Sequence, residues 1–286
     1  LGVAVFLAFA GNILVNYFVA LPLIDHWRVW LTWWPDFRQY LEGAFSVAPR
    51  LAVILLGGAA MVALGAYDDR YHLKAFPKLG CQIAIALMVA AAGMRLTLFV
   101  ANPVVSYVLT VLWIVLITNA MNYLDNMDGL CSGVGLVCAG LFGFIAAIQE
   151  QYFVCLLAAA LAGALLGFLP FNFKPATIFL GDAGSHLVGY LLAILPVLGS
   201  FYTATAPTWL PVLIPVLVLA VPLFDVVMVS WIRWRRGAPV YIGDVNHLSH
   251  RLVRLGLPQS WAVALIYLIT LTLGLGATIL LWSEMT

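Results

Sequence analysis

Seven of the twelve acidic residues of this 286-residue chain fall in or beside four polar segments that separate long apolar stretches. They are Asp68, Asp69, Asp125, Asp128, Asp182, Asp225 and Asp244. A carboxylate close to a lipid bilayer is costly and tends to mark function. Carboxylate oxygens are also the ligands that Mg²⁺ and Mn²⁺ prefer. The acids therefore predict a functional site, to which each polar segment contributes differently.

The first segment is an acid pair followed by lysines. Asp68, Asp69 and Arg70 close an apolar stretch, and Lys74 and Lys78 follow. Adjacent carboxylates on a helix point in different directions, so one could hold a metal ion while the other takes a proton. The lysines suit phosphate oxygens. Solvation of a helix end and the ordinary basic character of cytoplasmic loops are the alternative explanations.

The second segment repeats polar residues at every third position. Asn119, Asn122, Asp125 and Asp128 form a slowly turning polar stripe if the helix continues through them. Such a stripe at the end of a membrane helix suits a hydroxyl-rich ligand or a metal–phosphate site, with a structural helix cap as the alternative. Gly129 lets the backbone turn sharply after it.

The third segment places one acid between glycines. Gly181 and Gly184 flank Asp182, so the backbone can approach a ligand closely while the carboxylate reaches a cation. Phe179, two residues before this turn, could stack on a nucleobase or pack at the membrane interface.

The fourth segment follows a basic run and contains His247, His250 and Arg251 within five residues. These side chains could bind an anionic phosphate or transfer protons. A His-x-x-His pair can also bind metal, but no Cys and no third His lies near it in the sequence, so the oxygen ligands elsewhere favour Mg²⁺ or Mn²⁺ over Zn²⁺. Together the four segments predict a metal-dependent site for phosphoryl transfer at a membrane surface.

The elements that must position these segments are membrane helices. Apolar residues make up 64% of the chain and charged residues 9%, against about 25% charged in soluble domains. The net charge of +1 gives no general attraction to polyanions, which excludes nucleic-acid binding. Nine apolar stretches are long enough to span a bilayer: 1–24, 47–67, 79–101, 103–122, 130–149, 152–171, 186–206, 207–230 and 259–282. We expect a single all-α polytopic membrane domain over residues 1–286.

Charge distribution predicts which side of the membrane carries the site. The loops after the second, fourth, sixth and eighth stretches share one side and hold nine of the thirteen Lys and Arg residues. The positive-inside rule assigns them to the cytoplasm. The opposite loop, 25–46, is rich in tryptophan, which is typical of an interfacial aromatic belt. These tryptophans are Trp27, Trp30, Trp33 and Trp34.

The order of the motifs resembles the polyprenyl-phosphate N-acetylhexosamine-1-phosphate transferase superfamily. The motifs are DDR (68–70), NxxNxxDxxDGL (119–130), FNxxPAxxFxGDAGS (171–185) and DxxHLxHRL (244–252), and they cover nearly the whole chain. The resemblance implies transfer of a sugar phosphate from a UDP-N-acetylhexosamine to polyprenyl phosphate, with Mg²⁺ and release of UMP. It also implies the bacterial inner membrane, a cytoplasmic active site and a capacity to form homodimers.

Residue roles follow from the same resemblance. Asp182 matches the magnesium-binding acid, and Asp68 and Asp69 match the catalytic pair, with Asp68 a second candidate metal ligand. Lys78 matches a lysine of the loop after the pair. The nucleotide-sugar pocket corresponds to Asn122, Asp125, Asp128, Asn172 and Phe179, and Asn119 is a further substrate-binding candidate. The histidine motif corresponds to His247, His250 and Arg251, which implies contact with pyrophosphate.

The ending His-x-x-His-Arg-Leu is similar to the branch that starts envelope glycans such as O-antigen or teichoic acid with GlcNAc-1-phosphate. The phospho-MurNAc-pentapeptide transferase branch carries three consecutive histidines instead, and it is the alternative. Ser249 stands where the GlcNAc branch has a further histidine. The family has one helix before the first stretch seen here, so we expect an N-terminally truncated chain with ten helices when complete.

Two other classes of protein are alternatives to a transferase. A non-catalytic lipid-binding homologue is compatible with Ser249, although the intact acids argue against it. A transporter or channel would account for many helices and for Asp225, but Asp225 is a lone intramembrane acid near the membrane edge, and no pair of broken helices recurs in two halves.

Overall fold

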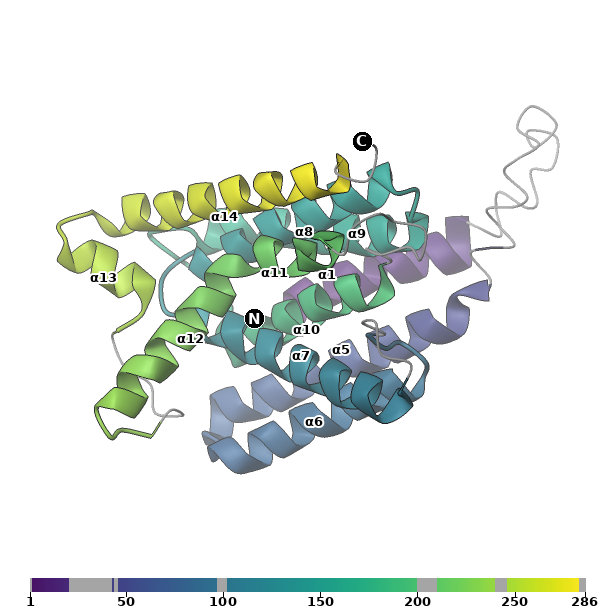
Figure 1. Cartoon of the computed structure of the whole chain (residues 1–286), viewed down its shortest axis with the longest axis horizontal. Helices are drawn as coiled ribbons and strands as arrows, with labels where there is room; N and C mark the ends of the chain where they lie inside the picture. Colours follow the sequence, from purple (N-terminus) through teal and green to yellow (C-terminus); the bar gives the residue numbers. More distant parts are fainter. Residues whose placement is uncertain are drawn as a thin grey trace.

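The computed structural model describes residues 2–20, 43, 46–96, 102–199, 210–239 and 246–282, and these form a bundle of helices without strands (Figure 1). In chain order the elements are α1 (Gly2–Val15), the π-helical turn η1 (Asn16–Ala20), α5 (Ala48–Tyr71), α6 (Ala75–Ala91), α7 (Pro103–Leu124), α8 (Leu130–Ile148), α9 (Tyr152–Asn172), α10 (Gly181–Leu198), the 3₁₀ turn η2 (Leu210–Leu213), α11 (Ile214–Val218), α12 (Ala220–Arg235), α13 (Leu248–Arg254) and α14 (Gln259–Trp282).

Six of the described helices are long and apolar enough to cross a membrane, namely α5, α7, α8, α9, α10 and α14. A seventh span results if Pro211–Val218, which includes α11, and α12 count as one, with a bend of 67° between them. Two shorter apolar helices are α1, with its extension to Phe18, and α6. Each of the nine expected stretches thus contains a helix, while the count of nine spans stays a prediction. The tryptophans of the 25–46 loop lie outside the described residues.

Two helix boundaries differ from the expected ones in a way that matters for the site. Helix α6 begins at Ala75, so Lys78 lies in its first turn and not in the preceding loop. Helix α10 begins at Gly181, so Asp182 lies in its first turn and not before it. Hydropathy alone misses both starts because the polar residues of a first turn lower the apolar average.

Helix α10 is the centre of the bundle. Its span is 83% buried, against 28% for α14, and it packs most extensively against α5 and α7. Gly65 of α5 allows this closeness, since a Cβ atom there would lie 2.3 Å from the Asp182 carbonyl oxygen. Gly189 of α10 plays the same part against Thr118 of α7, whose Cα would be 2.6 Å from the added Cβ. The end of α5 is therefore held against the start of α10.

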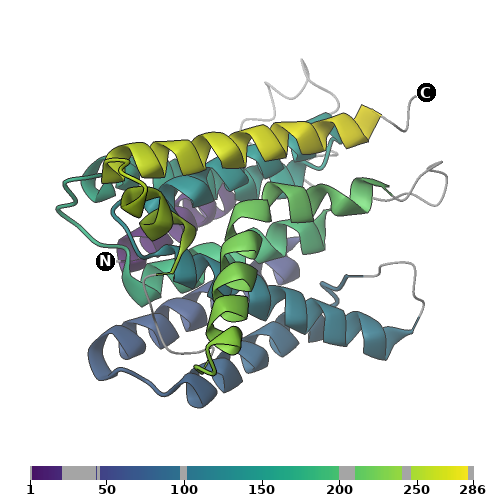
Figure 2. The same ribbon diagram turned by 60° about the vertical axis from the view of Figure 1, so that its left-hand side comes forward.

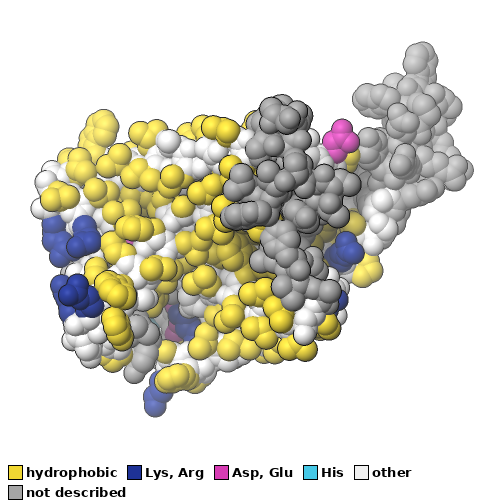
Figure 3. Space-filling view, viewed as in Figure 1, with side chains coloured by type: hydrophobic (Ala, Val, Ile, Leu, Met, Phe, Trp, Pro, Cys, Tyr) yellow, Lys and Arg dark blue, Asp and Glu magenta, His cyan; other side chains and the backbone are white. Residues whose placement is uncertain are grey.

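The four motif segments gather at one end of the bundle, which we call the motif end. There α5, α7 and α9 terminate, α10 begins, and α13 covers the turn after α7, on the left of Figure 1 and toward the viewer in Figure 2. The space-filling view shows Lys and Arg side chains at this end, next to a largely hydrophobic flank (Figure 3). This distribution suits a bundle whose flank faces lipid and whose motif end faces a polar phase.

Candidate active site

The two acids of the 68–69 pair point to different partners. Asp68 is buried, with one carboxylate oxygen accepting from the Leu73 backbone N at 2.6 Å and the other from Lys78 Nζ at 2.7 Å. His72 ends helix α5 in a left-handed conformation with φ 51°. Asp68 thus fastens the turn that brings α6, and with it Lys78, back to the end of α5.

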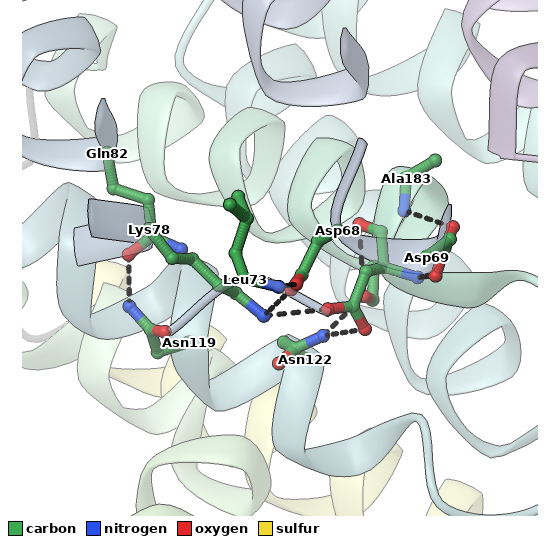
Figure 4. A network of polar contacts seen from close by, with 10 residues as sticks. Asp68, Asp69, Leu73, Lys78, Gln82, Asn119, Asn122 and Ala183 are labelled. Carbon is green, nitrogen blue, oxygen red and sulfur yellow. Dashed lines mark hydrogen bonds and ion pairs between the residues drawn. The ribbon is translucent and has the colours of Figure 1, made fainter. Parts of the chain in front are cut away.

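Lys78 joins two carboxylates that are more than a hundred residues apart in the sequence. Its Nζ lies 2.7 Å from Asp68 Oδ2 and 2.7 Å from Asp182 Oδ2 (Figure 4). The side chains of Lys78 and Asp68 are 16% and 9% exposed, whereas that of Asp182 is 31% exposed. Of the two carboxylates bound by Lys78, that of Asp182 is consequently the more open to a ligand.

Helix α7 holds the other oxygen of Asp182. Asn122 Nδ2 donates to Asp182 Oδ1 at 2.8 Å and lies 2.9 Å from Ser185 Oγ. Asp182 also stands in the first turn of α10, where the backbone N–H groups and the helix dipole favour negative charge. The carboxylate is therefore fixed in orientation from two sides.

Asp69 caps the start of α10. Its carboxylate oxygens accept from the backbone N of Asp182 at 2.8 Å and of Ala183 at 3.2 Å (Figure 4). Gly181 has φ +68°, and a Cβ there would lie 2.9 Å from Asp69 Oδ2. The expected divergence of the two acids is confirmed: Asp68 is directed to Lys78 and Asp69 to the α10 terminus.

The stripe of four polar residues on one helix is only partly correct. Helix α7 ends at Leu124, so Asn119 and Asn122 are helical while Asp125 and Asp128 lie in the turn that follows. Asn119 Nδ2 donates to Gln82 Oε1 at 2.7 Å, one turn deeper than Asn122.

The two acids of that turn contact the loop that leads into α10. Asp128 accepts from the Ala176 backbone N at 3.3 Å. Burial, and after it the charge of Asp182, raises the pKa of Asp125 to about 7, although a hydrogen bond from the Gly181 backbone N opposes the shift. Asp125 and Asp128 thus brace the segment that carries Asp182.

Two of the predicted pocket residues differ strongly in exposure. Asn172 is 3% exposed, and its amide accepts from Ser132 Oγ at 2.6 Å and donates to the Ile178 carbonyl at 2.9 Å. Its polar atoms therefore tie the loop before α10 to α8. Phe179, in the same loop, is 66% exposed and is free to meet a ligand.

The histidine motif is anchored to α12. His247, the residue before α13, lies with Nδ1 2.7 Å from Asp225 Oδ2, and its ring meets that of Tyr123 edge-on at 5.9 Å between centroids. His250 packs with its ring centroid 6.3 Å from that of His247. Arg251 is exposed and donates to Met228 Sδ at 3.3 Å. Asp244 lies outside the described residues.

Sequence reasoning missed the partners of this segment. Asp225 stood out as an acid in an apolar stretch, but nothing in its spacing identified His247 as its partner. Ser249, predicted as the position of a missing histidine contact, is 1% exposed and donates to Asn126 Oδ1 at 2.6 Å. It fastens α13 to the turn after α7.

The sequence model of glycosyl transferase family 4 matches residues 51–200, the segment that carries Asp68, Lys78, Asn122 and Asp182. The chain belongs to this family. As a member, it is an enzyme of the transferase class, and the predicted superfamily is confirmed.

Similar curated proteins carry related names. A probable undecaprenyl-phosphate N-acetylglucosaminyl 1-phosphate transferase of Bacillus subtilis is 34% identical over 248 residues, which is 84% of this chain and 68% of the relative. A decaprenyl-phosphate N-acetylglucosaminephosphotransferase of Mycobacterium tuberculosis is 33% identical, over 80% of this chain and 63% of the relative. A phospho-N-acetylmuramoyl-pentapeptide-transferase of Lacticaseibacillus paracasei is 35% identical, over 63% and 59%. The chain spans about two thirds of the length of the first two relatives.

Proposed function

We propose that this protein transfers N-acetylglucosamine-1-phosphate from UDP-N-acetylglucosamine to polyprenyl phosphate at the cytoplasmic face of the bacterial plasma membrane, with release of UMP. The observation that carries the proposal is the cluster of Asp68, Lys78 and Asp182 at the motif end of a membrane bundle. In the proposed reaction, these carboxylates and this cation would meet a lipid phosphate from the bilayer and a nucleotide from the cytoplasm.

The donor set fits a magnesium ion. Mg²⁺ is commonly held by one or two carboxylates together with waters and substrate phosphates, and Asp182 and Asp68 would supply the carboxylates. Across the described residues, no group of three or more His, Cys, Asp or Glu side chains is arranged to hold a metal ion, so phosphate oxygens would complete the coordination. When bound, the ion would neutralise charge on the pyrophosphate as it is attacked; Mn²⁺ has the same ligand preference.

Lys78, Asn122 and Asp69 would have different roles in the phosphoryl transfer. A lipid phosphate oxygen attacks the sugar-bearing phosphorus, and the bond to the UMP phosphate breaks. Lys78 moves from Asp182 to a phosphate oxygen, where its ammonium offsets developing negative charge. Asn122 and the α10 terminus, capped by Asp69, keep Asp182 in place. Catalysis then rests on alignment and charge neutralisation.

The choice of sugar rests on the relatives. The two proteins named for N-acetylglucosamine match 84% and 80% of this chain, whereas the muramoyl-pentapeptide relative matches 63%. The single His-x-x-His pair of this chain agrees with the same choice.

The test is UMP release by the full-length protein given UDP-N-acetylglucosamine, undecaprenyl phosphate and Mg²⁺. We expect release that requires both the lipid phosphate and the metal, and none from Asp182→Asn. Release with UDP-MurNAc-pentapeptide alone would move the protein to the alternative branch. A protein that releases no UMP from either donor would refute the proposed activity.

A further inference from the structure

Asp225 is an acid with no exposed surface in the middle of α12. Among the described residues, both of its carboxylate oxygens have a partner: Oδ2 lies 2.7 Å from His247 Nδ1, and Oδ1 accepts from the Leu248 backbone N at 2.7 Å. A buried carboxylate is tolerated only when such contacts replace its lost hydration. The two contacts join α12 to the first residues of α13, across 22 and 23 positions of sequence.

The chemistry of this pair fixes where the ring proton lies. An ionised carboxylate only accepts hydrogen bonds. The short contact therefore assigns a proton to Nδ1 of His247, and in the neutral form of the ring the lone pair is then on Nε2. Carboxylate partners of histidines in metal and catalytic sites set tautomer and ring orientation in this way.

The location of His247 connects the pair to the candidate site. Its ring meets Tyr123, and Tyr123 follows Asn122, which binds Asp182. On the other side of α13, Ser249 donates to Asn126 in the turn after α7. The ring is thus held between α12 and the end of the helix that orients Asp182.

We propose that Asp225 is a positioning residue for His247: it holds the ring against the end of α7 with Nδ1 as the hydrogen-bond donor, so that Nε2 of the neutral ring can accept a proton or a hydrogen bond from a substrate. The catalytic role of His247 in this inference rests on the proposed function, but the tautomer of its ring can be measured without turnover.

The decisive measurement is ¹⁵N NMR of the full-length protein labelled at histidine, in nanodiscs without substrate, at a pH where the rings are neutral. The His247 signals are assigned by their loss in His247→Gln. We expect the Nδ1–H tautomer in the wild type. In Asp225→Asn, the amide NH₂ can turn to Nδ1, which shifts the ring toward Nε2–H. A wild-type ring with Nε2–H would overturn the proposal whether or not the protein proves to be a transferase.

Ser249→Ala is the matched control, because it removes the other tie of α13 without touching the ring. We expect it to leave the His247 tautomer unchanged. A tautomer shift in Ser249→Ala equal to that in Asp225→Asn would mean that docking of α13, and not Asp225, sets the ring, and the proposal would fail.

Kinetics supply the second readout. Asp225→Asn should lower kcat by about 10- to 100-fold, in line with the effect of losing carboxylate partners of active-site histidines. In a His247→Ala background the same change should have almost no further effect, because the group through which it acts is gone. Losses that multiply in the double variant would refute the assignment. If Asp225→Asn does not fold, the wild-type tautomer still decides.

Discussion

Removal of the Lys78 ammonium leaves Asp68 and Asp182 as a pair of carboxylates without their shared cation. Breaking a fully buried ion pair costs about 3–5 kcal/mol, and an exposed one contributes about 0–1 kcal/mol. Lys78 and Asp182 are 16% and 31% exposed, which places their contact between these cases. For Lys78→Met in metal-free buffer we expect a loss of about 2 kcal/mol, or a fall in Tm of about 4–8 °C.

Magnesium should act differently on the two proteins. In the wild type, a Mg²⁺ ion held by Asp68 and Asp182, as proposed, would have to displace Lys78 from Asp182. In Lys78→Met no ammonium would compete with the ion. A ligand that binds the folded state raises stability in proportion to RT ln(1 + [L]/Kd). The variant should therefore gain more stability from millimolar Mg²⁺ than the wild type does, even though it loses UMP release.

The assay is thermal unfolding of the purified protein with EDTA and with increasing Mg²⁺, and Lys74→Met is the control. Lys74 is exposed and four residues before Lys78, so its substitution removes the same charge from the surface. Equal unfolding temperatures for the two variants in EDTA would refute the bridging role of Lys78. Equal gains from Mg²⁺ in Lys78→Met and the wild type would refute the shared metal site.

Three further predictions test the surroundings of the site. The pKa of Asp125 is about 7 in the folded protein, against about 4 in the unfolded chain. The stability that Asp125 contributes is therefore complete below pH 4 and is lost as the pH rises through 7. The free energy of unfolding of the metal-free protein should fall by about 2 kcal/mol between pH 5 and 8, and that of Asp125→Asn should fall clearly less. Gly65→Ala should lower the free energy of unfolding by about 1–3 kcal/mol and abolish most of the UMP release, because the added Cβ would lie 2.3 Å from the Asp182 carbonyl oxygen. Gly140→Ala, where no atom lies within 4 Å of the added Cβ, should change neither stability nor activity. Ser249→His should lower Tm without raising the rate of UMP release, because residue 249 is buried and has no room for an imidazole ring.

The gathering of the motifs at one end of the bundle could be predicted from the sequence. Membrane helices have nearly fixed length, so polar segments separated by an even number of them return to the same side. Asp68 and Asn122 are two apolar stretches apart, and Asp182 another two, and the structure brings the three side chains to one site. Polarity and spacing suffice for this level of the fold.

The pairing of side chains within that end could not be predicted. Lys78 contacts Asp182 across 104 positions, and Asp69 caps α10 across 113, because α5 and α10 touch at Gly65. A glycine in a helix indicates that another element packs closely against it, but it does not identify that element. The end of α7 at Leu124 was equally hidden, since the period of three in the polar residues continues past it.

Helix α13 depends most on contacts that are distant in sequence. It has seven residues, and a helix of that length is unstable alone because the cost of its first turn is not recovered. The structure supplies the missing stability through Asp225, which binds both His247 and the Leu248 N–H, and through the Ser249–Asn126 bond. Ser249 thus holds α13 to the turn after α7 through its hydrogen bond to Asn126. Because the His247 ring and the Leu248 N–H contact the same carboxylate, Asp225 contributes both to the docking of α13 and to the orientation of the ring.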